Sequence, residues 1–548
     1  MAEMLEGLMQ NDFQLTVHHI RRALLANRPD ATVTTLLEPG RVEKATYAQV
    51  SERVDRLARA LGKLGVEQGD RVGTFAWNNQ RHFELYFAIP CVGAVLHTLN
   101  IRLFEEQLTY IVNHAEDKIV FVDGSLVPLL EKLAPSFQTV KRYVVMGDPA
   151  AEVDTSSLPG AIHYEELLEQ AGPGSFDYPE LDERQAAALC YTSGTTGNPK
   201  GVLYSHRSIA MHSTATMFKD GLGLSRSDKV LAVVPMFHAN AWGLPHGAAL
   251  AGSDLLLPDR YLGAEPLAGL IASERPTLMG CVPTIFQDLL RFADEHPDVD
   301  LSSLTNATCG GSAVPRQLMK DFEERHGVRI FQAWGMTETS PVATFSRPPE
   351  GEHDDAYWDK RAKQGRPLPW VELRLVGDEG EVPWDGTSTG EIEVRGPWIA
   401  SQYFRDPDPD KFDSGWLRTG DIASGDEDAF VQITDRAKDV IKSGGEWISS
   451  VELENELMSH PQVVEAAVIA KPDERWAERP LCCVVLRSEG AASAEELVEH
   501  LRSRVAKWWL PDEFAFVQEI PKTSVGKFDK KVLRGQLAED SLQGRVKL

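Results

Sequence analysis

Short apolar runs alternate with amphipathic stretches in the first part of the chain. Residues 71–77, 94–99 and 119–122 have the apolar character of strands, and helical patterns at 81–89 and 105–114 lie between them. Strands that alternate with helices are typical of a parallel sheet covered by helices. The pattern therefore predicts an α/β fold.

Two helix starts carry a capping-box pattern. Thr46 is followed three residues later by Gln49, and Ser493 by Glu496, with apolar residues at helical spacing after each pair. In such a box each side chain accepts a hydrogen bond from the backbone N–H of the other residue. The sequence therefore predicts a helix at each point, the first of them ended by Gly65.

Further apolar runs end in loops of small and polar residues. Such runs lie at 230–234, 278–282 and 307–309. Parallel strands present their carboxyl ends at one edge of the sheet, where α/β proteins bind their ligands. These loops are therefore predicted to line one cleft.

The length of the chain indicates more than one domain. Its 548 residues exceed what one hydrophobic core usually serves. A charged segment with a glycine pair, residues 435–447, is typical of a domain boundary that can change conformation. We predict a large N-terminal domain of parallel-rich sheets flanked by helices (1–434), a hinge (435–440) and a small mobile α/β C-terminal domain (441–548).

Composition excludes several classes of function. The formal net charge of −26 argues against a nucleic-acid partner, whose phosphates would be repelled. An anionic nucleotide would need local cations, for which Lys200, Arg436 and Lys527 are candidates. No window approaches the ~20 apolar residues of a membrane span, and residues 1–11 lack a secretory pattern. The six cysteines show no metal-ligand spacing. We expect a cytoplasmic protein without zinc, disulfides or an integral membrane segment.

Residues 191–202 carry the strongest chemical signal. Their sequence is Tyr-Thr-Ser-Gly-Thr-Thr-Gly-Asn-Pro-Lys-Gly-Val, and they form a loop between two predicted strands. The glycines let backbone N–H groups turn inward, the hydroxyls add donors and Lys200 adds positive charge, all of which suit phosphate. The loop is not the P-loop of common nucleoside triphosphatases, because Pro199 stands where that pattern requires glycine. Taken alone, a polar surface turn is the alternative.

A second polar segment, residues 330–339, offers complementary groups. Trp334 presents a flat face to adenine, Thr337 a hydroxyl to a phosphate oxygen, and Glu338 an oxygen ligand to Mg²⁺. The alternative is a strand end followed by a capped helix. By themselves, His238 beside an apolar run is typical of packing and Asp421 after a glycine is typical of a turn.

The loop at 191–202 resembles the phosphate-binding signature of the acyl-adenylate-forming superfamily, which includes acyl-CoA synthetases, peptide-synthetase adenylation domains and firefly luciferase. The similarity extends over nearly the whole chain. It implies an enzyme that uses ATP, Mg²⁺ and coenzyme A (CoA) in two half-reactions. A carboxylic acid is first joined to AMP, and its acyl group then passes to the CoA thiol.

The resemblance implies roles for individual positions. Lys527 would contact both the carboxylate and the α-phosphate, and His238 would lie beside the carboxylate. Thr192 and Glu338 would take part in catalysis and hold Mg²⁺. Asp421 would bind the ribose hydroxyls.

The binding sites implied by the resemblance include more positions. ATP and CoA are expected at Thr192, Ser193, Gly194, Thr195, Thr196, Gly197, Lys200, Gly311, Ser312, Gln332, Ala333, Trp334, Gly335, Met336, Thr337, Asp421, Ile433, Arg436, Lys438, Lys442, Gly444, Gly445, Glu446 and Trp447. The acid is expected at His238, Trp242, Val282, Gly310 and Gly335, with Trp242 gating an acyl tunnel. Trp334 stands where the family normally has Tyr, which keeps the flat face but loses the hydroxyl.

The hinge position in the family corresponds to Lys438. The resemblance implies that the C-terminal domain rotates there after the first half-reaction. This rotation would withdraw Lys527 and present the face with Gly444 and Gly445 to the pantetheine arm of CoA.

Two segments of the sequence indicate which carboxylic acid is the substrate. Residues 77–82 and 444–454 most resemble medium- and long-chain fatty acyl-CoA synthetases. The 3-methylmercaptopropionate-CoA ligases share these features, so a short sulfur-containing acid is the alternative. A homodimer is expected from the likeness to dimeric relatives.

Three other classes of protein share some or all of these motifs. A luciferase-type oxygenase shares every motif, whereas a peptide-synthetase domain is not expected because the chain ends soon after Lys527. A non-catalytic acyl or nucleotide binder would not need the full set of charged groups, which are Lys200, Glu338, Asp421, Arg436 and Lys527.

Overall fold

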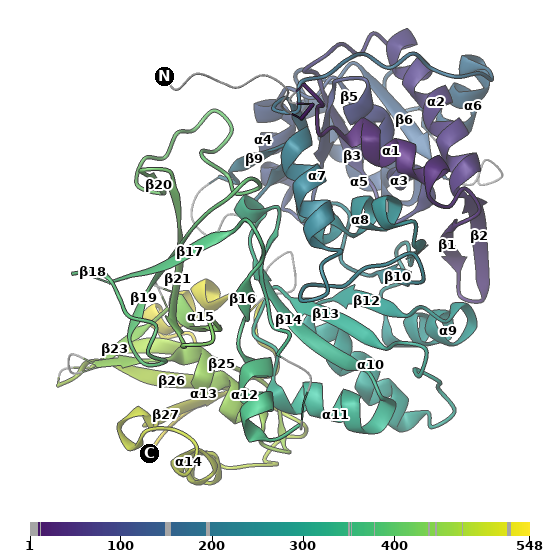
Figure 1. Cartoon of the computed structure of the whole chain (residues 1–548). Coiled ribbons are helices and arrows are strands. Elements are labelled where there is room, and N and C mark those ends of the chain that lie inside the picture. The colour runs from purple at the N-terminus through teal and green to yellow at the C-terminus, as the bar shows by residue number, and fades with distance from the viewer. Residues whose placement is uncertain are drawn as a thin grey trace.

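The computed structural model describes residues 9–10, 12–147, 155–192, 198–348, 351, 353–377, 379–436, 439–443, 446–473, 475–522 and 528–548, without the side chains of residues 436, 442, 446 and 447. It contains two α/β layers, an antiparallel sheet and a small C-terminal module (Figure 1). The predicted α/β fold is confirmed.

The first α/β sheet has the strand order β7–β6–β5–β3–β4–β8–β9. Neighbouring strands are parallel as far as β8, and β9 runs antiparallel to β8 at the edge. The strands are β3 (Arg71–Phe75), β4 (Val95–Thr98), β5 (Ile119–Asp123), β6 (Arg142–Met146), β7 (Ile162–His163), β8 (Ala186–Tyr191) and β9 (Gly201–Ser205). The runs predicted to be strands in this region therefore form one sheet.

The second α/β sheet has the order β16–β15–β14–β13–β12–β10–β11–β1–β2. Its central strands from β14 to β1 are parallel, and antiparallel strands close both edges. The strands are β1 (Thr32–Glu38), β2 (Arg41–Thr46), β10 (Lys229–Ala232), β11 (Asp254–Leu257), β12 (Leu278–Cys281), β13 (Asn306–Gly310), β14 (Arg329–Gly335), β15 (Val342–Phe345) and β16 (Arg366–Pro367). The predicted strand-then-loop units thus end at one edge of one sheet.

Helices cover both sheets, and α3 lies between them. The N-terminal helices are α1 (Val17–Ala26), α2 (Tyr47–Lys63), α3 (Gln80–Cys91), α4 (Glu105–Ala115), α5 (Val127–Leu133), α6 (Tyr164–Ala171), α7 (His206–Ala215), α8 (Leu244–Ala251), α9 (Ala264–Glu274), α10 (Pro283–Glu295), α11 (Arg316–His326) and α12 (Asp355–Ala362). Helix α3 contacts β4 and β8 of the first sheet and β1 of the second, and all its residues except Arg81 are buried. It therefore contributes to the interior on both sides.

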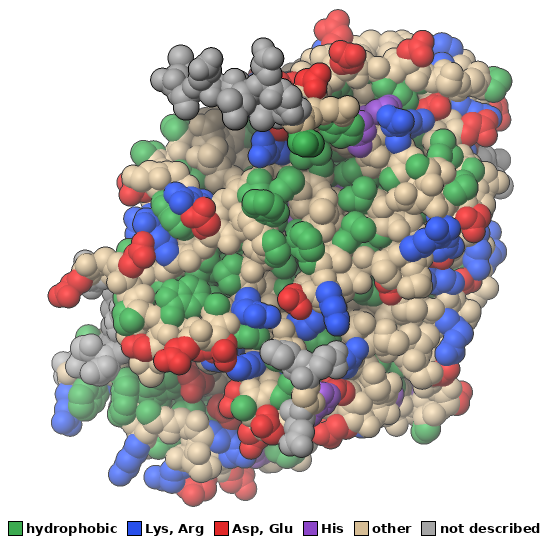
Figure 2. Space-filling view, viewed as in Figure 1, with side chains coloured by type: hydrophobic (Ala, Val, Ile, Leu, Met, Phe, Trp, Pro, Cys, Tyr) green, Lys and Arg blue, Asp and Glu red, His purple; other side chains and the backbone are tan. Residues whose placement is uncertain are grey.

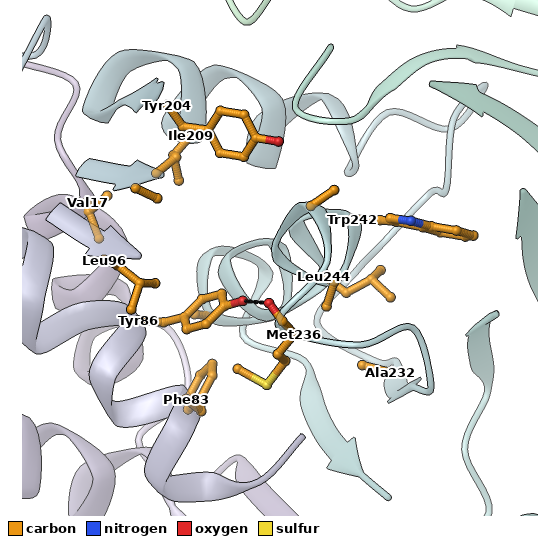
Figure 3. Close-up of a cluster of buried hydrophobic side chains, with 14 of the residues drawn as sticks. Val17, Phe83, Tyr86, Leu96, Tyr204, Ile209, Ala232, Met236, Trp242 and Leu244 are labelled. Carbon is orange, nitrogen blue, oxygen red and sulfur yellow. Dashed lines mark hydrogen bonds between the residues drawn. The ribbon is translucent and has the colours of Figure 1, made fainter. Parts of the chain in front are cut away.

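The core around α3 reaches the loop after β10 (Figure 3). Phe83 and Tyr86 come from α3, Leu96 from β4 and Leu244 from α8. The Tyr86 hydroxyl donates a hydrogen bond to the carbonyl of Met236. This bond fixes the backbone of the loop that carries His238.

Both predicted capping boxes are present. Thr46 and Gln49 exchange the two hydrogen bonds at the start of α2, which ends just before Gly65. Ser493 and Glu496 do the same at α14 (Ala494–Arg502). Local chemistry defines these helix starts, as predicted.

An antiparallel sheet follows the second α/β layer. Its strands are β17 (Glu372–Gly377), β18 (Gly380–Glu381), β19 (Thr389–Arg395), β20 (Phe412–Asp413), β21 (Trp416–Gly425) and β22 (Val431–Arg436). Asp421 pairs with Arg436 within β21 and β22, so the Gly-Asp pair lies inside a strand. Taken alone, that pair had indicated a plain turn, and this interpretation is wrong.

The C-terminal module packs against the end of β22. It consists of β23 (Ile441–Ser443), β24 (Glu446–Ile448), α13 (Ser450–Met458), β25 (Val463–Asp473), β26 (Ala477–Leu486), α14, β27 (Glu513–Phe516), α15 (Lys530–Ala538) and β28 (Arg545–Lys547). The backbone N–H of Ser450 donates to Asp435 Oδ2 at 2.7 Å, and the Ser449 hydroxyl donates to the carbonyl of Thr434. The start of α13 is thereby attached to the N-terminal part.

Charged side chains of both signs are interspersed over the face seen in Figure 2. In the described ranges, no helix is both long enough and apolar enough to cross a bilayer. The cysteines are free and buried.

Candidate active site

One cavity of ≈ 650 Å³ lies at the carboxyl ends of the central strands of the second sheet. Predicted site residues that line it are Thr192, Lys200, His238, Trp242, Val282, Gly310, Gly311, Ser312, Gln332, Ala333, Trp334, Gly335, Met336, Thr337, Glu338, Asp421 and Ile433. Residues separated by hundreds of positions in the sequence thus surround one space. Their individual roles remain predictions.

Other predicted residues lie outside the described parts of the chain. They are Ser193, Gly194, Thr195, Thr196, Gly197, Lys438, Gly444, Gly445 and Lys527, together with the side chains of Arg436, Lys442, Glu446 and Trp447.

The predicted phosphate loop connects two antiparallel strands, β8 and β9. At its base the backbone N–H of Thr192 donates to the carbonyl of Lys200 at 2.9 Å, and the N–H of Lys200 donates to the Thr192 hydroxyl at 3.1 Å. These two bonds close the hairpin. The second bond also holds the side chain of Thr192, which lines the cavity.

The Lys200 ammonium lies between acidic groups and an aromatic ring. Its Nζ is 2.5 Å from Asp408 Oδ2, 3.2 Å from Asp406 Oδ2 and 4.8 Å from the centre of the Tyr403 ring. Burial opposes the charge, but the hydrogen bonds to Asp408 and Asp406 raise the pKa of Lys200. The lysine is therefore a cation inside the cavity, and a bound phosphate would compete with these carboxylates for it.

Glu338 is 5% exposed, and its carboxylate accepts a hydrogen bond from the Tyr403 hydroxyl at 2.6 Å. It lines the cavity, where oxygen ligands suit Mg²⁺. No group of three or more His, Cys, Asp or Glu side chains suited to a metal occurs among the described residues. Mg²⁺ commonly uses one or two carboxylates together with phosphate and water, so this site fits a metal that arrives with a nucleotide.

The side chains of Trp334 and Asp421 are joined by a hydrogen bond. The indole Nε1–H of Trp334 donates to Asp421 Oδ2 at 2.9 Å, and both side chains are buried, at 7% and 1% exposure. The indole can thus present a flat face while it orients a carboxylate. A nucleoside suits this pair, because the base would stack and the ribose hydroxyls would donate to the carboxylate.

The side chain of Gln332, in strand β14, forms hydrogen bonds to two neighbouring segments. Its Oε1 accepts from the N–H of Val314 at 3.0 Å, and its Nε2 donates to the carbonyl of Ala362 at 2.5 Å. The side chain is therefore committed to neighbouring loops, although the residue borders the cavity.

The loop after His238 has a strained backbone. Ala239, Asn240, Ala241 and Trp242 have φ values of 43°, 50°, 50° and 57°, in the left-handed region. A non-glycine residue there costs roughly 1–2 kcal/mol, so surrounding contacts must hold the turn. The Asn240 side chain provides one such contact, because its Oδ1 accepts a hydrogen bond from the Cys190 thiol of β8 at 3.1 Å.

The turn places Trp242 at the border of the apolar part of the cavity. In Figure 3 its indole points away from Phe83 and Tyr86. A Cβ added to Gly310 would lie 3.4 Å from the ring and 2.7 Å from the Ala333 carbonyl oxygen, so glycine permits this close approach. Other apolar side chains that line the cavity include Val233, Val234, Phe237, Val282 and Ile285.

The C-terminal module closes another side of the cavity. Val451, Glu454, Asn455, Met458, Phe528, Asp529 and Lys530 line it. Lys530 Nζ is 2.7 Å from Glu454 Oε1 and donates to the Ser450 hydroxyl at 2.6 Å. The residues that directly follow Lys527 in the sequence therefore border the same space as Trp334 and Asp421.

Comparison with known proteins identifies this arrangement. The AMP-binding enzyme family matches residues 21–404, and its C-terminal domain matches residues 452–527. The chain belongs to the AMP-binding enzyme family. The family prediction made from the sequence is confirmed.

Several characterised members of the family are similar over most of this chain. A medium-chain-fatty-acid–CoA ligase of Ectopseudomonas oleovorans is 44% identical over 507 residues, which cover 92% of each chain. A 3-methylmercaptopropionyl-CoA ligase of Ruegeria pomeroyi is 45% identical over 516 residues, 93% of this chain and 95% of the relative. A long-chain-fatty-acid–CoA ligase of Thermus thermophilus is 45% identical over 538 residues, 96% of each.

A solved structure has the same fold. The crystal structure of an anthranilate CoA ligase in complex with anthranoyl-AMP superposes with a TM-score of 0.86 at 27% identity. The match covers 97% of this chain and all of the other. Binding of an adenine nucleotide is thus a property of the family to which this enzyme belongs.

Several residues at the cavity were not predicted from the sequence. Tyr403, Asp408 and Arg102 were not selected, nor was Asp406, which reaches Lys200. Arg102 lies 5.9 Å from the centre of the Phe237 ring, and burial lowers its pKa. The acidic run at 406–410 was a visible signal, but nothing in its spacing pointed to Lys200.

An open groove of ≈ 850 Å³ on the C-terminal module contains none of the predicted residues in the described part. Its charged groups pair with one another, with Lys471 and Arg545 both 2.6 Å from Glu513. It is therefore a surface of ion pairs apart from the cavity described above.

Proposed function

We propose that this enzyme is an ATP-dependent acyl-CoA synthetase for a medium- or long-chain fatty acid. It would form an acyl-AMP intermediate, transfer the acyl group to CoA, and release AMP and pyrophosphate. The observation that carries the proposal is one cavity lined both by apolar side chains and by the hydrogen-bonded pair Trp334 and Asp421. The apolar lining, which includes Trp242, suits an acyl chain, and Trp334 with Asp421 suits a nucleoside.

In the first half-reaction a carboxylate oxygen of the acid bonds to the α-phosphorus of ATP while the bond to pyrophosphate breaks. Both reactants are anionic, so the enzyme must supply positive charge and alignment. Lys200 would leave Asp406 and Asp408 to meet phosphate oxygens, and Lys527 would contact the carboxylate and the α-phosphate. Mg²⁺, when bound, would neutralise phosphate charge, and Glu338 with Thr192 would hold it.

In the second half-reaction the CoA thiol bonds to the acyl carbon and AMP leaves. We propose that residues 441–548 form a lid that rotates about a hinge at 435–440, as predicted, and that residues 1–434 form the main domain. The hydrogen bonds that attach Ser449 and Ser450 to Thr434 and Asp435 lie beside this hinge. The position of residues 528–530 at the cavity supports a role for the lid in the first half-reaction.

A short sulfur-containing acid is the second candidate substrate. The 3-methylmercaptopropionyl-CoA ligase of R. pomeroyi is as similar to this chain as the fatty-acid ligases are. Trp242 lines the cavity, and if it gates the acyl site as proposed, its position would restrict the length of the acid.

Pyrophosphate release with saturated acids from three to eighteen carbons and with 3-methylmercaptopropionate, each with and without CoA, tests the proposal. We expect acid-dependent release, accelerated by CoA, with an optimum at medium or long chains. An optimum at 3-methylmercaptopropionate would support the second candidate. Nucleotide binding without release for any acid would contradict a synthetase and favour a binding protein.

We propose a cytoplasmic location, because the proposed reaction uses ATP and CoA. We also propose a homodimer. Exposed apolar side chains near the N-terminal segment and α7, among them Phe13, Leu25, Met217 and Phe218, are consistent with a covered surface. Light scattering coupled to size-exclusion chromatography would test this.

A further inference from the structure

The segment 400–408, here called the strap, connects the two halves of the polar site. The backbone N–H of Ala400 donates to the carbonyl of Glu338 at 2.8 Å, and the N–H of Phe404 donates to the carbonyl of Gly201 at 2.7 Å. Glu338 follows strand β14, and Gly201 begins β9 at the end of the phosphate hairpin. The strap therefore bonds to the backbone of both elements.

Tyr403 is the strap residue whose side chain reaches both elements. Its hydroxyl donates to Glu338 Oε1 at 2.6 Å, and its ring lies 4.8 Å from Lys200 Nζ. The residue is 5% exposed, and its ring packs edge-on against Phe412 with the centres 5.1 Å apart.

This contact determines how the carboxylate is presented. A carboxylate without partners rotates about its last bond, whereas a hydrogen bond to one oxygen fixes the plane of the group. The bond occupies Oε1 and leaves Oε2 as the oxygen for a cation. The Lys200 ammonium lies 4.8 Å from the centre of the same ring, so Tyr403 contacts both charged groups.

We propose that Tyr403 is a positioning residue that orients Glu338 toward the metal accompanying ATP. The inference rests on the proposed function, because it assigns Tyr403 to the metal and phosphate end of that site. Tyr403 acts through Glu338 and through the placement of Lys200.

Tyr403→Phe removes the hydroxyl and keeps the ring. Loss of a hydrogen bond to a charged group is expected to raise the half-saturating Mg²⁺ concentration by about tenfold or more. At saturating Mg²⁺, kcat should stay within about threefold, because the groups that contact substrate are retained. Pyrophosphate release as a function of Mg²⁺, at saturating ATP and acid, measures both.

Tyr204→Phe is the matched control. Tyr204 is 3% exposed, and its hydroxyl donates to the carbonyl of Thr337 at 2.7 Å, one residue from Glu338. Both variants lose one buried tyrosine hydroxyl, but the control leaves the Glu338 carboxylate untouched. We expect similar losses of melting temperature in the two variants and an altered Mg²⁺ requirement in Tyr403→Phe alone.

A binding measurement separates this inference from the proposed function. Electron paramagnetic resonance of Mn²⁺ with ATP, without acid or CoA, should show weaker metal binding in Tyr403→Phe, while AMP affinity without metal stays unchanged. Tyr403→Phe added to Glu338→Ala should have no further effect on metal binding, because no carboxylate then remains for Tyr403 to orient. Equal Mg²⁺ and Mn²⁺ requirements in wild type and Tyr403→Phe, or equal shifts in both tyrosine variants, would overturn the inference. Failure of the wild type to release pyrophosphate with any acid would instead overturn the proposed function, and the Mn²⁺ arm would still test Tyr403.

Discussion

Trp334→Phe removes a single hydrogen-bond donor from the nucleoside end of the cavity and keeps a flat aromatic face. The donor removed is the indole N–H that lies 2.9 Å from Asp421 Oδ2. A hydrogen bond to a charged group contributes about 1.5–3 kcal/mol, and the ribose hydroxyls would recover part of this when ATP binds. We therefore take the lower end of this energy range, about 1.5 kcal/mol, which corresponds to an about tenfold weaker interaction with ATP.

The assay is pyrophosphate release at saturating acid and Mg²⁺ with ATP varied. We expect KM for ATP to rise about tenfold while kcat changes by less than about threefold, because the change weakens ground-state and transition-state binding alike. ATP and 3′-deoxy-ATP should be compared in both enzymes. Wild type should prefer ATP, and the variant should discriminate less, because Asp421 has lost its fixed orientation.

Two results would refute this reasoning. An unchanged KM for ATP with undiminished discrimination would mean that Asp421 keeps its position without Trp334. Fully additive effects of Trp334→Phe and Asp421→Asn would mean that the two side chains do not act together.

Two further predictions concern other parts of the molecule. Four buried histidines are expected to make the fold sensitive to acid, namely His82, His206 and His246, whose pKa burial lowers to about 4, and His212, whose pKa burial lowers to about 3. Each is neutral when folded but binds a proton when unfolded below about pH 6.5, so the stabilisation is complete above that pH and is lost as pH falls toward 4. His212→Gln should therefore reduce the loss of unfolding free energy between pH 7 and pH 5 by about 2 kcal/mol in urea titrations, and an unaltered pH profile would contradict the calculation. The two half-reactions should also separate: Lys527→Ala should abolish acyl-AMP formation but spare thioester formation from supplied acyl-AMP, whereas Lys438→Pro should do the reverse. Equal loss of both activities in each variant would exclude the hinge.

The sequence predicted features that depend on neighbours along the chain. The capping boxes at Thr46 and Ser493 and the strand runs of the first sheet follow from local periodicity and local hydrogen bonds. The family signature at 191–202 then led to a set of residues that one cavity brings together. The roles of those residues remain to be tested.

Contacts between distant segments were not predictable in this way. Tyr403 is 65 residues from Glu338, Trp334 is 87 from Asp421, and Lys200 is 208 from Asp408. No periodicity spans such separations, because sheet order and register determine which loops meet. Asp421 illustrates the same limit, since a local Gly-Asp pattern indicates a turn and pairing with β22 makes it part of a strand.

The antiparallel pairing of β8 and β9 has an electrostatic consequence. Where a phosphate loop leads into a helix, the macrodipole of that helix supplies about half a positive charge at no cost in side chains. The dipoles of adjacent antiparallel strands nearly cancel, so strands β8 and β9 supply no comparable positive charge. If this hairpin binds a polyphosphate as proposed, the attraction would have to come from other charges, and the ammonium at position 200 would change partner from carboxylate to phosphate and back within each turnover.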